Sequence, residues 1–198
     1  MRLVLDWDGT VTERDTLHMT IERFGDLGVF RDMEERLGRE LTLNEVIGTE
    51  MATISAPFDE VVAWLLETVT VRAGFAELVA AHDPLIVSAG FSELIEPILE
   101  REGIGASLIA NHLVPDSAGW QAVFLERELC AVCGEPCKRM ALVSASPFAY
   151  VGDGVSDRCV SLAAARVFAR DGLATWLAGQ NVPFEAYGDL HDVRRALA

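Results

Sequence analysis

The sequence has few basic residues, few cysteines and no long hydrophobic run. Among its 198 residues, 16 are Lys or Arg and 31 are Asp or Glu, which gives a formal net charge of −15 at pH 7. Nucleic-acid backbones and anionic membranes bind clusters of basic residues, so this charge argues against both as partners. Four cysteines are too few for a disulfide-stabilised scaffold. The apolar stretches all fall short of the roughly 18 residues that a membrane span needs.

The amino-terminal residues do not resemble an export signal, because Asp6 interrupts the short apolar run at 2–5. We therefore expect a cytoplasmic protein with reduced cysteines. Hydrophobic residues make up 51% of the chain, which is enough for a folded core and too much for a disordered chain. The length predicts one domain, or one core with a small accessory domain.

Lysine is nearly absent, since one of the 16 basic residues is Lys138 and all others are arginines. Where arginine replaces lysine so widely, the remaining lysine is expected at a place that needs a compact point charge and excludes a planar guanidinium. A surface lysine left by chance is the alternative interpretation.

Short apolar runs alternate with helical patterns over most of the chain. Strands are predicted at 2–5, 84–87, 107–112, 149–151, 166–169 and 183–186, with 120–124 pairing back as a hairpin. Helices are predicted at 75–82, 91–102, 136–144, 156–164, 172–179 and 189–197. This alternation predicts an α/β fold, with a parallel sheet covered by helices on both faces.

Residues 13–72 follow a different pattern, with apolar positions at helical spacing and no convincing strand. One apolar stripe begins after Pro57, a residue typical of helix starts, and runs from Phe58 to Val69. Acidic residues outnumber basic ones throughout this stretch. We expect a helical unit at 13–72, separate from a core formed by 1–12 and 73–198.

Acidic residues follow two of the predicted strands: Asp6 and Asp8 flank Trp7 after the first, and Asp153 and Asp157 follow the fourth. The carboxyl ends of parallel strands meet at one edge of a sheet, and alternation turns Asp6 and Asp8 the same way. Converging carboxylates repel one another unless a cation lies between them, and Mg²⁺ prefers such oxygen ligands. Helix-capping aspartates would explain one or two of these acids, but poorly explain all four.

Four motifs occur in order: D-W-D-G-T-V-T at 6–12, S-A-G at 88–90, Lys138, and G-D-G-V-S-D at 152–157. Together they resemble the motifs of the haloacid dehalogenase superfamily, in the form used by its phosphatases. The helical stretch 13–72 falls where that superfamily carries a helical cap. The chain is most similar to the phosphoserine-phosphatase-like branch, including phosphatases of methylthiopentenyl phosphate and phosphocholine.

This resemblance implies a Rossmann-like α/β core with a small helical cap inserted after the first strand. It also implies a Mg²⁺-dependent hydrolase of phosphate monoesters that acts on a small phosphorylated metabolite. Asp6 would be the nucleophile that forms an aspartyl-phosphate, and Asp8 would be the general acid and base. Mg²⁺ would be held by Asp6, the backbone carbonyl of Asp8 and Asp153, with Asp157 as a ligand or a neighbour of the ligands.

The resemblance assigns phosphate binding to Ser88, the backbone N–H of Ala89, and Lys138. The partner would be a small-molecule phosphate ester, and the chain a monomer or homodimer. Two other functions remain open. A phosphotransferase would pass the same aspartyl-phosphate to an alcohol, and a non-catalytic phospho-receiver or sensor would also gather aspartates and a lysine. A receiver, however, would lack the acid–base Asp8 and a large helical cap.

Residues for substrate specificity are expected near the start of the helical unit, at Glu13, Asp15 and His18. A solvated helix start is the competing interpretation for each of them. The acidic character of the unit suggests a cationic or polar leaving group rather than one with a second acid. Arg36 and Arg39 are available for the carboxylate of phosphoserine, but neither aligns clearly, so phosphoserine is not favoured.

Three of the cysteines, Cys130, Cys133 and Cys137, have short metal-ligand spacing, and Cys159 could be a fourth ligand. The sequence has no second Cys-x-x-Cys pair. On the sequence alone, buried reduced thiols that hold the Lys138 loop are favoured over a structural zinc site.

Overall fold

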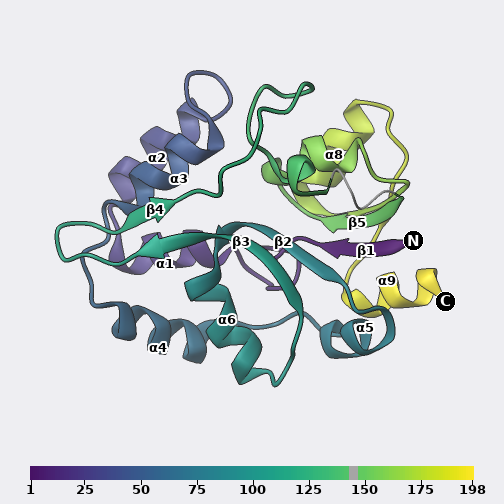
Figure 1. Cartoon of the computed structure of the whole chain (residues 1–198), viewed down its shortest axis with the longest axis horizontal. Helices are drawn as coiled ribbons and strands as arrows, with labels where there is room; N and C mark the ends of the chain where they lie inside the picture. The colour runs from purple at the N-terminus through teal and green to yellow at the C-terminus, as the bar shows by residue number, and fades with distance from the viewer. Residues whose placement is uncertain (143–146) are drawn as a thin grey trace.

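The computed structural model describes residues 1–142 and 147–198, which form a seven-stranded sheet of order β4-β3-β2-β1-β5-β6-β7 (Figure 1). The antiparallel pair is β3 with β4, and the other neighbouring strands are parallel. The strands are β1 (Arg2–Leu5), β2 (Leu85–Phe91), β3 (Ser107–Val114), β4 (Gln121–Val123), β5 (Phe148–Gly152), β6 (Arg166–Ala169) and β7 (Glu185–Ala186).

The central strand β1 is covered on both faces, which explains why Leu3, Val4 and Leu5 are all apolar and buried. Val4 and Leu5 are fully buried, and every residue of β5 beside it is buried as well. Leu5 pairs with Ile86 of β2 and Val151 of β5, and the three strands run parallel, so their carboxyl ends point to the same side. This register brings the loops that follow these three strands to one edge of the sheet.

Helices cover both faces of the sheet, and the predicted α/β fold class is confirmed. In Figure 1, α5 (Phe75–His82), α6 (Ser92–Arg101) and α9 (Leu190–Leu197) lie below the sheet, and α8 (Asp171–Gly179) lies above it. The short α7 (Arg158–Ser161) packs against α8. Within the described residues, no helix is both long enough and apolar enough to cross a membrane.

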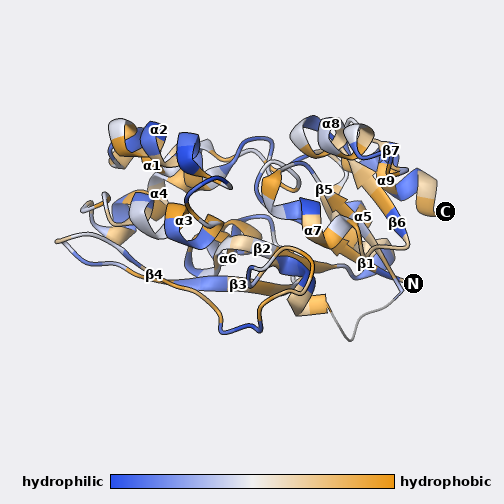
Figure 2. Ribbon diagram, turned by 90° about the horizontal axis from the view of Figure 1, so that it is seen from above, coloured by the Kyte–Doolittle hydropathy of each residue, from blue (hydrophilic) through white to orange (hydrophobic). Residues whose placement is uncertain are grey.

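Four helices lie between β1 and α5: α1 (Thr16–Phe24), α2 (Leu27–Arg36), α3 (Leu43–Met51) and α4 (Phe58–Thr68). Figures 1 and 2 place them at one end of the molecule, opposite α8 and α9. Helix α4 buries Val61 and Leu65 of the predicted stripe and packs against α6. The chain enters and leaves this segment at neighbouring points, because Thr12 and Val71 form an antiparallel bridge.

Three elements differ from the sequence prediction. Strand β2 continues to Phe91, so 88–90 lies inside the strand, because Phe91 still pairs with Asn111 of β3. The helix predicted at 136–144 is a short 3₁₀ helix, η1 (Lys138–Leu142), and 143–144 lie outside the described residues. The helix predicted at 156–164 is divided into η2 (Val155–Asp157) and α7, because the Asp157 carboxylate takes up backbone N–H groups at its start.

Candidate active site

The loop after β1 presents Asp6 and Asp8 to one cavity, as the alternation of side chains predicts. The intervening Trp7 is fully buried on the other side, where its ring meets Phe75 edge-on with 6.3 Å between ring centroids. The backbone N–H of Asp6 donates to the carbonyl oxygen of Val151 at 2.9 Å. The strand pairing therefore continues to the residue that carries the buried carboxylate.

Gly9 lets this loop pass close to the loop after β5. Its φ is +72°, and a Cβ added there would lie 2.2 Å from Oδ2 of Asp153, so any side chain would displace that carboxylate. The hydroxyl of Thr10 also donates to Oδ1 of Asp153 at 3.1 Å. The first and fourth motifs are thus in direct contact.

Arg72, which follows α4, holds the loop after β1 from the opposite side. Its Nε donates to the carbonyl oxygen of Thr10 at 2.8 Å, and its Nη2 donates to those of Gly9 at 2.8 Å and Thr12 at 3.1 Å. The side chain is buried, so these bonds are shielded from water. The loop that carries Asp8 is therefore fastened to the chain returning from the four helices.

Lys138 lies behind Asp6 and joins the two acidic loops. Its Nζ donates to Oδ1 of Asp6 and, at 2.8 Å, to Oδ1 of Asp157, and its side chain is 3% exposed. Burial by itself would lower the pKa of Lys138, but the two carboxylates raise it above its ordinary value. The only lysine of the sequence is thus buried, and its ammonium group lies between two carboxylates. This is the kind of position expected for it, because it needs a compact positive charge.

Asp157 is held by hydrogen bonds on both carboxylate oxygens. Oδ1 accepts from Lys138 and from the hydroxyl of Tyr150 at 2.6 Å, and Oδ2 accepts the N–H groups of Asp153 at 2.9 Å and Gly154 at 3.0 Å. Burial opposes ionisation of Asp157, but Lys138 and the other donors lower its pKa below the ordinary value. Asp157 is therefore ionised, and its acceptor sites are already used by the protein.

Carboxylate oxygens of Asp6, Asp153 and Asp157 lie within 4.8 Å of one another. Burial, with repulsion from Asp157, raises the pKa of Asp6 well above its usual range and raises that of Asp153 to about 6. These raised pKa values mean that Lys138 offsets only part of the negative charge around the two carboxyls. Hard oxygen donors with excess negative charge fit a small divalent cation such as Mg²⁺. Within the described part of the chain, the hydrogen bonds of Asp6 and Asp153 use Oδ1 and leave Oδ2 of each available.

Asp8 is positioned by the first residue of α1, because Oδ1 accepts both the N–H of Thr16 at 2.8 Å and its hydroxyl. Burial and the nearby Asp15 raise the pKa of Asp8 to about 7, against the opposing effect of the Thr16 hydrogen bonds. A carboxyl group that titrates near neutral pH can both donate and accept a proton during a reaction.

The end of β2 forms another wall of the cavity, through Ala89 and Gly90. Ser88 is fully buried beneath them, and its Oγ accepts the N–H of Gly90 at 2.8 Å. The carbonyl oxygen of Ala89 accepts from Nδ2 of Asn111 at 2.7 Å. Ser88 and Lys138 thus stand behind the cavity, whereas Asp6, Asp8 and Asp153 line it.

The cavity, of about 210 Å³, extends from these acids to α1, α2 and α3. Asp15 and His18 line it, and Asp15 also caps α1 by accepting the N–H of His18 at 2.8 Å. Glu13 is exposed and does not line this cavity. Arg36 is paired at the surface with Asp32 and Glu40.

Glu50 of α3 lies in the same cavity and is 5% exposed, and its Oε1 has no hydrogen-bond partner within residues 1–142 and 147–198. Burial, with repulsion from Glu34 and Asp15, raises the pKa of Glu50 to about 8. An unsatisfied buried carboxyl group is costly, and here it faces open space. Glu50 could not be found from the sequence, because nothing in its local pattern distinguishes it from the other acids of the helices.

Comparison with known proteins places this geometry in a family. A family model for haloacid dehalogenase-like hydrolases matches residues 3–161, which include all four motifs. The chain belongs to this family. The superfamily proposed from the motifs is therefore confirmed, and with it the expectation of an enzyme of this hydrolase type.

Several similar sequences and structures are described as phosphatases. Proteins of Bacillus cereus and Bacillus anthracis described as 2-hydroxy-3-keto-5-methylthiopentenyl-1-phosphate phosphatase are 23% identical, over all of this chain and 95% of theirs. A phosphoserine phosphatase solved as an analogue of the phospho-aspartyl intermediate has a TM-score of 0.70 at 15% identity, covering 98% of this chain and 97% of its own. The enzyme from T. onnurineus has a TM-score of 0.69 at 18% identity, covering 97% and 91%.

Proposed function

We propose that the protein is a Mg²⁺-dependent phosphomonoester hydrolase for a small phosphorylated metabolite, working through an aspartyl-phosphate. One observation carries this proposal: Asp6 and Asp8 line one cavity, while the buried Lys138 fixes Asp6 from behind. The family membership and the phosphatase relatives support it.

In this proposal, the free oxygen of Asp6 attacks phosphorus and displaces the alcohol, and Asp8 gives its proton to the leaving oxygen. Asp8 then takes a proton from the water that hydrolyses the aspartyl-phosphate. Lys138 orients Asp6 and offsets part of the charge of the phosphoryl group. Asp6, Asp153 and the backbone carbonyl of Asp8 would hold Mg²⁺, which would supply the remaining positive charge at the phosphate, and Asp157 would orient Lys138.

We further propose that 13–72 acts as a cap over this site. The segment joins the core through two neighbouring chains at Thr12 and Val71, and its helices contribute residues such as His18 and Glu50 to the cavity. A cap whose chain leaves and rejoins the core at neighbouring points can exclude water from the site and select substrates.

The cap side of the cavity favours a cationic or polar leaving group. Asp15, Glu34 and Glu50 line it, and among the described lining residues His18 carries the basic side chain. An ammonium group would relieve their mutual repulsion, and a neutral group rich in oxygen could accept a proton from Glu50. A leaving group with a second acid would add to the repulsion. Phe30 and Ile21 provide apolar contact for a carbon or sulfur chain.

The test is Mg²⁺-dependent phosphate release from a panel that includes phosphocholine, a methylthiopentenyl phosphate and phosphoserine. We expect turnover that is lost in Asp6→Asn, with the acidic leaving group the slowest. Unchanged phosphate release by Asp6→Asn would refute the mechanism, and fastest turnover of phosphoserine would refute the leaving-group class. Product analysis with added alcohols distinguishes hydrolysis from phosphoryl transfer.

Glu50→Gln tests the role of the cavity carboxyl. We expect KM for a cationic substrate to rise about tenfold with a smaller change in kcat, because a buried charge contact of about 1.4 kcal/mol is lost. Glu60→Gln, at an exposed position of α4, is the matched control and should leave KM unchanged. Equal effects of the two substitutions would exclude Glu50 from substrate binding.

A further inference from the structure

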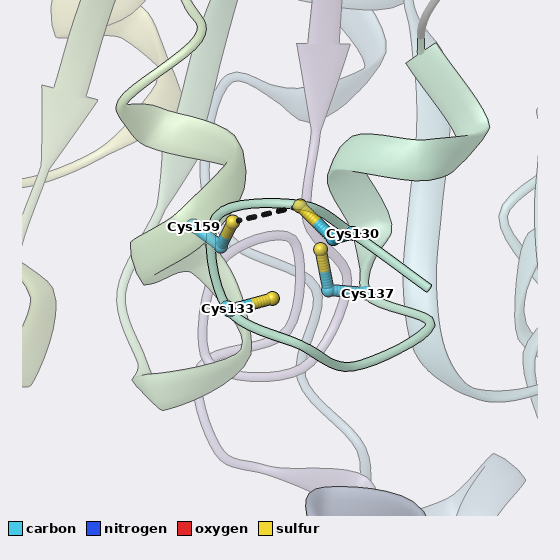
Figure 3. Close-up of side chains that lie close together, drawn as sticks. All are labelled: Cys130, Cys133, Cys137 and Cys159. Atoms are coloured by element: carbon cyan, nitrogen blue, oxygen red, sulfur yellow. Dashed lines mark hydrogen bonds between the residues drawn. The ribbon is translucent and has the colours of Figure 1, made fainter. Parts of the chain in front are cut away.

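The four cysteines, separated by up to 29 positions in the sequence, come together beside the active site. Their sulfur atoms all lie within 4.8 Å of one another. Figure 3 shows the side chains of Cys130, Cys133 and Cys137 pointing from one loop toward the same centre, and Cys159 pointing toward it from α7. We propose that Cys130, Cys133, Cys137 and Cys159 bind a structural zinc ion.

The distance between sulfurs fits a single tetrahedral ion. Zinc–sulfur bonds of about 2.3 Å place the sulfurs of a tetrahedral site about 3.8 Å apart. The Sγ atoms of Cys130 and Cys159 are 3.7 Å apart, far beyond the bond length of a disulfide, about 2.05 Å. An iron–sulfur cluster would hold the sulfurs further apart, because several irons and sulfides would lie between them.

The loop geometry turns the sulfurs inward. Gly134 has a φ of +77° directly after Cys133, and its N–H donates to the carbonyl oxygen of Cys130 at 2.8 Å. The N–H of Val132 points to Sγ of Cys130 at 3.5 Å. Amide groups directed at sulfur favour the thiolate, which is the form that binds metal once the thiol proton leaves.

Two arginines beside the cysteines carry positive charge that a zinc–thiolate group would balance. Arg127 and Arg158 line a cavity together with Cys133, Cys137 and Cys159. Nη2 of Arg127 and Nε of Arg158 are buried and have no hydrogen-bond partner in the described part of the chain. Four thiolates with one Zn²⁺ carry a net charge of about −2, which would compensate two guanidinium groups.

The position of the cluster gives the zinc a structural role. Cys137 directly precedes Lys138, and Cys159 follows Asp157 by two residues, so one ion would tie together the segments that carry the 2.8 Å Lys138–Asp157 contact. Zinc here would position these residues without touching the substrate. This proposal departs from the expectation of free reduced thiols, which the sequence favoured because it has no second Cys-x-x-Cys pair.

Metal analysis of the reduced, full-length protein tests the proposal independently of any activity. After reconstitution with zinc and gel filtration, we expect close to one zinc per chain. Cys130→Ser and Cys159→Ser should lose that zinc to a chelator concentration that leaves the parent loaded. Val132→Ala alters the same loop without removing a ligand, and should keep the zinc. Zinc loss by Val132→Ala equal to that of the cysteine variants would overturn the assignment.

Cobalt titration covers the case in which the serine variants fail to fold. The reduced, metal-free parent should take up one Co²⁺ per chain and develop the intense visible bands of tetrahedral cobalt thiolate. Addition of Zn²⁺ should remove these bands. A parent protein that binds neither ion, holds iron in preference, or forms a Cys130–Cys159 disulfide in the presence of zinc would refute the site.

Discussion

Replacing Lys138 by methionine should destabilise the protein as well as inactivate it. Methionine keeps the unbranched shape of the side chain but removes the ammonium group between Asp6 and Asp157. Both carboxylates are almost completely buried, with side-chain exposures of 4% and 0%. Breaking a buried ion pair by removing one partner costs about 3–5 kcal/mol, because the remaining charge is left uncompensated.

For a chain of this length, about 3–5 kcal/mol corresponds to a fall in Tm of roughly 6–20 °C. Urea unfolding without Mg²⁺, followed by circular dichroism, measures the loss directly. Arg39→Met removes one positive charge from an exposed position and should change the free energy of unfolding by less than about 0.5 kcal/mol. If Lys138→Met were as stable as Arg39→Met, the buried ion pair would not exist in solution.

The difference in the free energy of unfolding between the parent and Lys138→Met depends on pH in a defined direction. Lys138 and the other donors lower the pKa of Asp157 in the folded protein. Ionised Asp157 therefore stabilises the fold above the ordinary pKa of Asp, and this stabilisation disappears as the pH falls through the lowered pKa. The pKa of Lys138 is raised, so its contribution is present below the ordinary pKa of Lys and disappears as the pH rises through the folded value. The parent and Lys138→Met should therefore differ most between about pH 5 and 9.

Two further predictions concern Asp8 and the proposed Mg²⁺ site. With the pKa of Asp8 at about 7 in the free protein, kcat/KM should fall as the pH rises above that value, since the protonated carboxyl is the acid for the leaving group. Asp8→Asn should remove this limb and slow an alkyl phosphate more than p-nitrophenyl phosphate, whereas equal losses would deny Asp8 the role of acid. Gly9→Ala places a Cβ 2.2 Å from Oδ2 of Asp153 and would displace that carboxylate. The Mg²⁺ concentration for half-maximal activity should therefore rise by about tenfold or more. Gly103→Ala has a similar positive φ without that collision and should leave the Mg²⁺ requirement unchanged.

The core of the site could be predicted from the sequence because it depends on local patterns. An apolar run followed by D-x-D indicates a buried strand and the loop after it, and an apolar run followed by G-D-G supplies Asp153 in the same way. The scarcity of lysine pointed to Lys138, which the structure places between Asp6 and Asp157.

Other parts of the site depend on contacts between distant segments, and the sequence could not show them. Arg72 binds carbonyl oxygens 60 to 63 positions earlier in the chain. Glu50 is distinctive only because folding buries its Oε1, which has no hydrogen-bond partner among residues 1–142 and 147–198. Tyr150 looks like an ordinary core residue of β5 until its hydroxyl meets Asp157. The strand predicted at 84–87 ends too early. Pairing with β3 extends β2 to Phe91 through small residues that have a weak preference for strands.

The bridge between Thr12 and Val71 bears on how such a protein can diverge. Because the helical segment starts and finishes at adjacent points, residues can be gained, lost or exchanged within it while the sheet keeps its register. Arg72 keeps the loop of Asp8 fastened at that same junction, whatever lies beyond it. If the segment selects the substrate as proposed, specificity can diverge through changes within it while the loop that carries Asp6 and Asp8 stays the same.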